Sequence, residues 1–131
     1  METKNKFRNR VDYDQNNLTA YNKIGLELIS LGIPANIKGY RYLNEAISIV
    51  INSFEGMNNI TRILYPNIAM KFQTNASSVE RAMRYAINAG FVRGCKEKLN
   101  KRAGYKLYES VKVPTNTEFI AIVSAVLKDA V

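Results

Sequence analysis

The residues of this chain best suited to binding chemistry lie on one predicted helix, which runs from Ala76 to about Ala89. Its apolar side chains recur at three- and four-residue steps, which is the spacing of a buried helix face. The same spacing turns five polar or charged residues outward: Ser77, Arg81, Arg84, Tyr85 and Asn88. Ser78 and Glu80 lie at the edges of this exposed face. The set can form ion pairs and hydrogen bonds, and no nucleophile in it has an adjacent base.

Arginine and glutamate at the start of an exposed helix can bind the edges of DNA bases. Arg donates two hydrogen bonds to O6 and N7 of guanine, and Glu accepts from N4 of cytosine. A helix in the major groove contacts bases with residues near its N-terminus, where Glu80 and Arg81 lie. Arg84, Tyr85 and Asn88 are further along, so we expect them at phosphates or the groove wall.

Positive charge is concentrated around this helix. Between Ile60 and Arg102 there are nine Lys or Arg and two Glu, a net of +7 out of the formal +8 of the 131-residue chain. Because cations placed on phosphates release condensed counterions, this excess suits a polyanionic partner. We therefore predict double-stranded DNA as the partner and expect further backbone contacts from the basic residues that follow the helix. Together with Ser77, these are Arg93, Lys96, Lys98, Lys101 and Arg102.

Each candidate contact also has a purely structural interpretation. Glu80 can close a capping box with Ser77, since Ser-x-x-Glu is a helix-start signature, although Asn75 is an equally good N-cap. Arg81 and Arg84 can form an ordinary solvated helix face.

The remaining two candidates have structural interpretations as well. Tyr85 can pack on a neighbouring helix. The basic stretch after Gly94, CKEKLNKRAGYKLYESVKVP, is glycine-punctuated and too sparse in apolar residues for a long helix, so we expect a loop with a short element. The run from Lys96 to Arg102 within it can simply be a solvated loop.

The helix of the candidate site belongs to a predicted helix-turn-helix, which extends from about Tyr65 to 89. Pro66 suits the first turn of its first helix, because that position has no hydrogen-bonded N–H. Ala69 allows the second helix to approach closely, and Thr74-Asn75-Ala76 is the expected turn. Ile68 and Phe72 are expected to face inward.

Four more helices are predicted from period and capping signals. They are a helix with Asn17 as N-cap that ends before Gly32, a helix from Lys38 to Phe54, a short helix from Ile60 to Leu64, and a last helix that begins at Thr115 with a Thr-x-x-Glu capping box. No strand signal of useful length appears. The sequence thus predicts one all-α domain over residues 17–131 after a flexible polar arm, residues 1–16.

Composition argues against several other classes of protein. Cys95 is the only cysteine and there is no histidine, so we expect no disulfide, no metal site, no cofactor and no enzymatic activity. No stretch reaches the roughly 18 apolar residues of a membrane helix, and the N-terminus lacks the apolar core of a signal peptide. We therefore expect a cytoplasmic protein without membrane contact.

Four stretches of the chain resemble, in the same order, the DNA-binding effector domain of the stage-zero sporulation protein A family, which comprises the master sporulation response regulators of endospore-forming bacteria. They are LGIPANIKGYRYLNEAI from Leu31, ITRILYPNIAMKF from Ile60, ASSVERAMRYAI from Ala76 with the later Arg93-Gly94, and PTNTEFIA from Pro114. Several stretches in register are far more specific than a single helix-turn-helix pattern.

The resemblance implies a six-helix fold whose recognition helix binds a box similar to TGTCGAA. It implies base contacts by Glu80 and Arg81, supported by Arg84. This chain has Ser78 where the family has a guanine-contacting arginine and Tyr85 where the family has a histidine, so the preferred box is expected to be relaxed or altered.

The resemblance also implies protein partners. Surfaces near the last helix are implied to contact a second protomer or RNA polymerase with its sigma factor, and the candidate residues there are Phe119, Ile120 and Val123. Core packing is an alternative role for these side chains. We expect a monomer in solution and a head-to-tail dimer on tandem DNA sites.

The family couples this effector to a phosphorylated receiver domain. The three aspartates here, Asp12, Asp14 and Asp129, do not follow a predicted strand, so we expect no receiver-type control. The leading hypothesis is a stand-alone, sequence-specific transcription regulator. The alternative is an interaction module that binds RNA polymerase or a full-length paralogue and binds DNA only weakly, and the serine at position 78 is the feature in its favour.

Overall fold

The computed structural model describes residues 15–52, 60–103 and 113–130. Within these ranges the chain forms six helices and no strand, which confirms the all-α class and the six-helix expectation. The helices are α2 (Gln15–Ser30), α3 (Lys38–Ile51), α4 (Ile60–Lys71), α5 (Ala76–Val92), α6 (Cys95–Ala103) and α7 (Asn116–Ala130).

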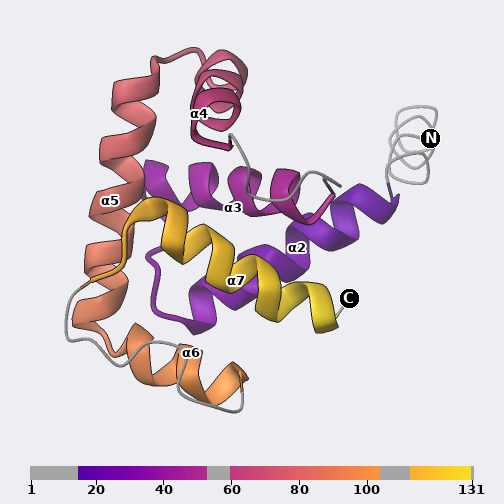
Figure 1. The fold of residues 1–131 in the computed structure, drawn as a ribbon, viewed down its shortest axis with the longest axis vertical. Helices are drawn as coiled ribbons and strands as arrows, with labels where there is room; N and C mark the ends of the chain where they lie inside the picture. Colours follow the sequence, from indigo (N-terminus) through magenta and orange to yellow (C-terminus); the bar gives the residue numbers. More distant parts are fainter. Residues whose placement is uncertain (1–14, 53–59, 104–112, 131) are drawn as a thin grey trace, which may run out of the picture.

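Helix α3 lies at the centre of the fold and contacts α2, α4, α5 and α7 (Figure 1). Its inward face includes Leu43, Ala46 and Ile47, each with no exposed surface. At Gly39 the helix passes very close to α5, because an added Cβ would lie 2.7 Å from Cβ of Ala86. Glycine at this crossing therefore brings the central helix directly against the predicted recognition helix.

Helix α2 ends where the glycine signal predicts. Gly32 has φ +92°, a left-handed conformation that glycine adopts without strain. Around it, Ile33 N donates to Leu28 O at 3.0 Å and Gly32 N donates to Ile29 O at 2.9 Å, the two bonds of a Schellman motif. Asn17 lies inside this helix rather than at its N-cap, so that prediction is wrong.

The helix-turn-helix consists of α4, a short turn and α5. Ile68 and Ala69 of α4 and Val79 of α5 are buried at 0%, 5% and 0% exposure, as expected for the surfaces that face each other and the core. The predictions of a separate short helix from Ile60 to Leu64 and of a helix start at Pro66 are wrong, because α4 is continuous through Pro66. Buried Leu64 and Ile68 lie on either side of Pro66, so packing holds the helix together although one N–H is missing.

The turn between α4 and α5 depends on a residue that the sequence did not single out. Gln73 has φ 55°, the left-handed conformation, and Thr74 N donates across it to Ala69 O at 2.8 Å. The turn comprises residues 72–75 and begins two residues earlier than expected, and Ala76 is already the first residue of α5.

The basic segment after α5 contains the nine-residue helix α6, the short element expected there, so Lys96 to Arg102 belong to a helix and not to a loop. Two residues one turn apart explain it, since Cys95 and Leu99 are buried at 0% and 2% exposure. Burial raises the pKa of the Cys95 thiol to about 12, and Lys98 opposes this shift only in part. Cys95 is therefore a core residue that remains protonated near neutral pH.

The other predicted elements agree with the structure apart from their ends. Helix α5 continues to Val92, three residues beyond the prediction, and α3 ends at Ile51. Phe54 and residues 1–14 of the predicted arm lie outside the described residues. In the described ranges, none of the helices has the length and hydropathy needed to cross a membrane.

Candidate nucleic-acid interface

The start of α5 is fixed by Asn75, which leaves Glu80 available for other contacts. The Asn75 side chain accepts a hydrogen bond from Ser78 N at 2.9 Å, so Asn75 is the N-cap. Ser77 lies inside the helix, which excludes the alternative capping box between Ser77 and Glu80.

Glu80 instead forms an ion pair on the exposed face. Arg84 Nη2 lies 3.3 Å from Glu80 Oε1, one helical turn away, and the two side chains retain 65% and 47% exposure. An exposed i,i+4 pair is weak, so both groups can exchange this contact for one with a ligand.

The remaining predicted residues of α5 lie on the same side of the helix. Ser77, Arg81, Tyr85 and Asn88 are exposed, and Ser78 is half-buried at the edge of this face. Tyr85 keeps 67% of its surface exposed, so its ring does not pack into the core. The structure therefore brings together all seven residues predicted on this helix, and we call them the recognition face.

The other predicted backbone contacts lie at the opposite end of α5, on and beside α6 (Figure 1). Helix α5 has 17 residues and is about 25 Å long, so its first turn is far from α6. Lys98 and Lys101 are exposed, and Lys96 is half-buried.

Two arginines of this second group have partners within the fold. Arg102 Nε lies 2.8 Å from Glu27 Oε1, and its guanidinium also donates to the Ser30 hydroxyl. Arg93 Nη1 donates to Gly32 O at 3.4 Å. Arg102 holds the end of α6 against α2, and Arg93 holds the end of α5 against the turn that follows α2. Contact of either side chain with a phosphate would have to compete with these bonds.

The three candidate partner contacts of α7 are core residues. Phe119, Ile120 and Val123 have exposures of 0%, 1% and 0%, because they form the inward face of the helix. Their alternative role in core packing is therefore the correct one, and a partner that binds α7 would meet exposed positions such as Glu118 and Lys128.

The first turn of α7 touches both helices of the helix-turn-helix. Asn116 Nδ2 donates to Glu80 O at 3.0 Å and to Tyr65 Oη at 3.3 Å. Sequence reasoning missed this side chain, because the capping box around it explained its position and its partners lie 36 and 51 residues earlier in the chain.

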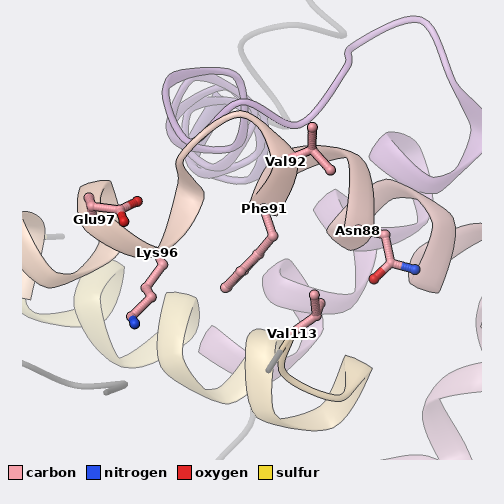
Figure 2. Close-up of a pocket in the computed structure, with 6 residues that line it drawn as sticks. All are labelled: Asn88, Phe91, Val92, Lys96, Glu97 and Val113. Carbon is pink, nitrogen blue, oxygen red and sulfur yellow. The ribbon is translucent and has the colours of Figure 1, made fainter. Parts of the chain in front are cut away.

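An open pocket of about 470 Å³ lies at the junction of α5 and α6 (Figure 2). Its lining comprises Asn88, Phe91, Val92, Lys96, Glu97 and Val113. In the described part of the chain, no group of three or more His, Cys, Asp or Glu could hold a metal ion. The pocket is mostly apolar and borders the recognition face at Asn88.

A helix-turn-helix whose second helix exposes arginines, hydroxyls and an amide along one face defines a class, that of the helical DNA-binding domains. A family model described as the C-terminal domain of the sporulation initiation factor Spo0A matches residues 24–127. The chain belongs to this family, and it is a DNA-binding domain of the sporulation-regulator type. This is a family of DNA-binding domains rather than of enzymes.

Proposed function

We propose that this chain is a sequence-specific transcription regulator whose helix α5 binds in the major groove of a short DNA box related to TGTCGAA. In this proposal Glu80 and Arg81 contact base edges, with Ser78 and Arg84 beside them. Its action in the cytoplasm needs no phosphorylation of the chain. The observation that supports DNA binding by α5 is the exposed recognition face, on a helix whose N-cap leaves Glu80 free of a capping role.

Backbone contacts follow from the same placement. Ser77, Tyr85 and Asn88 flank the base-contacting residues on α5 and are exposed. The major groove is about 12 Å wide, so a helix about 25 Å long extends past it to the neighbouring phosphates. We propose that Lys98 and Lys101 of α6 bind those phosphates. Lys96, Arg93 and Arg102 then make supporting contacts with the same phosphates.

Selection of bound sequences from random duplex DNA tests the proposal. The winning duplex and a scrambled duplex are then titrated with the chain at roughly 0.05, 0.15 and 0.3 M salt, a range over which surface charges become screened. Enrichment of a box related to TGTCGAA, with much tighter binding than to scrambled DNA, is the expected result. Salt-sensitive binding without enrichment would instead support the alternative, an interaction module that binds RNA polymerase or a full-length paralogue.

Assembly is tested in the same titration. We propose that the chain is a monomer in solution and that two copies bind tandem boxes head to tail. Analytical ultracentrifugation of the free chain and of its complexes with one or two boxes would give the stoichiometry. A dimer in the absence of DNA would contradict this part of the proposal.

Arg81→Ala should weaken binding to the selected box by roughly 1–3 kcal/mol, the value of one bidentate contact to guanine. Binding to scrambled DNA should change much less, because only one phosphate-attracting charge is removed. Lys128→Ala is the matched control, since it removes one exposed positive charge from the last turn of α7. Equal losses of affinity on selected and scrambled DNA would show that Arg81 does not contact bases.

A further inference from the structure

A buried amide connects the last helix to the helix that contacts bases. Asn116 is 5% exposed, and its side chain reaches the point where α4, α5 and α7 meet. An asparagine amide has two N–H donors, and here the Nδ2 group donates to Tyr65 Oη of α4 and to Glu80 O of α5. One side chain therefore contacts both helices of the helix-turn-helix.

The acceptor on α5 is a specific peptide group. The carbonyl of Glu80 belongs to the peptide that joins Glu80 to Arg81, the two residues to which we assign base contacts. A carbonyl oxygen has two lone pairs, so it can accept from Asn116 and from the helical N–H of Arg84 together. The bond from Asn116 thus fixes the height and rotation of this peptide without breaking the helix.

The base of α7 is itself held firmly. Thr115 N donates to Glu118 Oε1 at 2.9 Å and Glu118 N donates to Thr115 Oγ1 at 3.1 Å, which is a closed capping box around Asn116. Tyr65 is 8% exposed, so the second acceptor is also packed in place. The amide is therefore held from both ends, whereas the side chains of the recognition face are exposed.

We propose that Asn116 is a positioning residue for base recognition: by holding the Glu80–Arg81 peptide against α4 and α7, it determines how strongly the chain discriminates between DNA sequences. This inference rests on the proposed function. Base contacts tolerate displacements of only about 0.5 Å, so a peptide that can shift should bind matched and mismatched boxes more equally.

The test measures the ratio of the Kd for scrambled DNA to the Kd for the selected box. Asn116→Ala removes both donors, and Asn116→Asp keeps the shape but replaces the donors with acceptors. We expect the ratio to fall roughly three- to tenfold in both variants, as for the removal of one or two net hydrogen bonds. Affinity for scrambled DNA should change much less, at least for Asn116→Ala, whose charge is unaltered.

Leu127→Ala is the control for reduced stability. Leu127 is a 7% exposed core residue of the same helix, and its truncation should lower Tm without moving the Glu80–Arg81 peptide. All titrations are made well below the lowest Tm. An unchanged ratio for Leu127→Ala supports the inference, whereas a fall equal to that of Asn116→Ala would attribute the effect to stability and overturn it.

A measurement on the unmodified chain covers the case in which the variants do not fold. In NMR spectra of the free and DNA-bound chain, the side-chain amide protons of Asn116 should exchange with water far more slowly than those of Asn36, which is exposed and lies outside the proposed interface. Equal exchange in the two amides would overturn the inference. An unmodified chain that shows no sequence preference would refute the proposed function as well, whereas an undiminished preference in Asn116→Ala would overturn only the inference.

Discussion

Glu80 is the only acidic residue of α5, and a polyanion such as DNA repels it. The ion pair with Arg84 at 3.3 Å reduces this repulsion, because the pair is neutral as a unit. When Arg84 moves toward a phosphate or a base, the Glu80 carboxylate needs a donor such as N4 of cytosine. The pair therefore favours DNA that supplies both an acceptor and a donor, which is a form of sequence discrimination.

Ser78 is the position at which the resemblance to the sporulation regulators implies an arginine that contacts guanine. Ser78→Arg should shift the selected DNA toward the TGTCGAA-like box and improve discrimination by roughly 1–3 kcal/mol, because an arginine there can donate two hydrogen bonds to guanine. Repeated selection from random duplex DNA measures the shift. Ser77→Arg adds the same charge one residue earlier, and it should increase affinity for all sequences similarly. An unchanged selected sequence for Ser78→Arg would show that position 78 does not face the bases.

Gln73 adopts a left-handed backbone conformation that most residues avoid. The conformation costs an L-residue roughly 1–2 kcal/mol, and a glycine costs about 0.5–1 kcal/mol through the unfolded chain. Gln73→Gly should therefore raise the free energy of unfolding by up to about 1 kcal/mol, as measured by urea denaturation. Gln73→Val is the comparison, since its β-branched side chain should lower stability; a Val variant as stable as Gly would contradict the assigned conformation.

At the scale of the elements, periodicity predicted which faces are buried better than it predicted where helices end. The inward residues of α5 follow directly from apolar spacing, and so does its exposed face. Pro66 was misjudged as a helix start, because local propensity opposes a proline inside a helix and tertiary burial overrides it. In the basic segment, sparse apolar residues hid the extent of α6, although most of its residues are good helix formers. The contact between Asn116 and Glu80 could not be predicted, because it depends on how α7 crosses α5.

The capping box of α7 gives this helix a pH-dependent start. Hydrogen bonds from Thr115, first from its backbone N–H, lower the pKa of Glu118 below its ordinary value of 4.5. The carboxylate therefore stabilises the folded state above pH 4.5, and this contribution disappears as pH falls through the lowered folded value. We expect denaturation experiments to show a stability advantage of the unmodified chain over Glu118→Gln at neutral pH.

The two proteins should converge in stability as pH falls well below 4.5, since protonation removes the same charge that the substitution removes. Because Glu118 is exposed, the difference at neutral pH should be small. Thr115→Ala in both backgrounds tests the hydroxyl: it should reduce the difference between Glu and Gln only in part, because the backbone N–H of residue 115, the first cause of the lowered pKa, is retained. A difference that is constant from pH 7 to about 3 would indicate that the charge of Glu118 has no role in the cap.

For the whole molecule, the distribution of charge matters more than its total. Of the formal +8, +7 lies between Ile60 and Arg102, and this segment forms α4, α5 and α6 along one side of the fold (Figure 1). The start of α5 and the exposed lysines of α6 are at its two ends. A duplex that follows this side would meet cations over a length of about 25 Å, the length of α5.

This arrangement predicts which lysines cause the salt dependence of DNA binding. If Lys98 and Lys101 bind phosphates, the double variant Lys98→Ala, Lys101→Ala should weaken selected and scrambled DNA alike and reduce the slope of log K against log salt by about 0.9 for each phosphate that is no longer neutralised. The matched control removes Lys23 and Lys128, which are exposed on α2 and α7, and should leave the slope nearly unchanged. Fluorescence anisotropy titrations at several salt concentrations give both slopes. Equal slopes for the two double variants would show that net charge alone attracts the DNA and that α6 lies outside the interface, which would restrict DNA contact to α5.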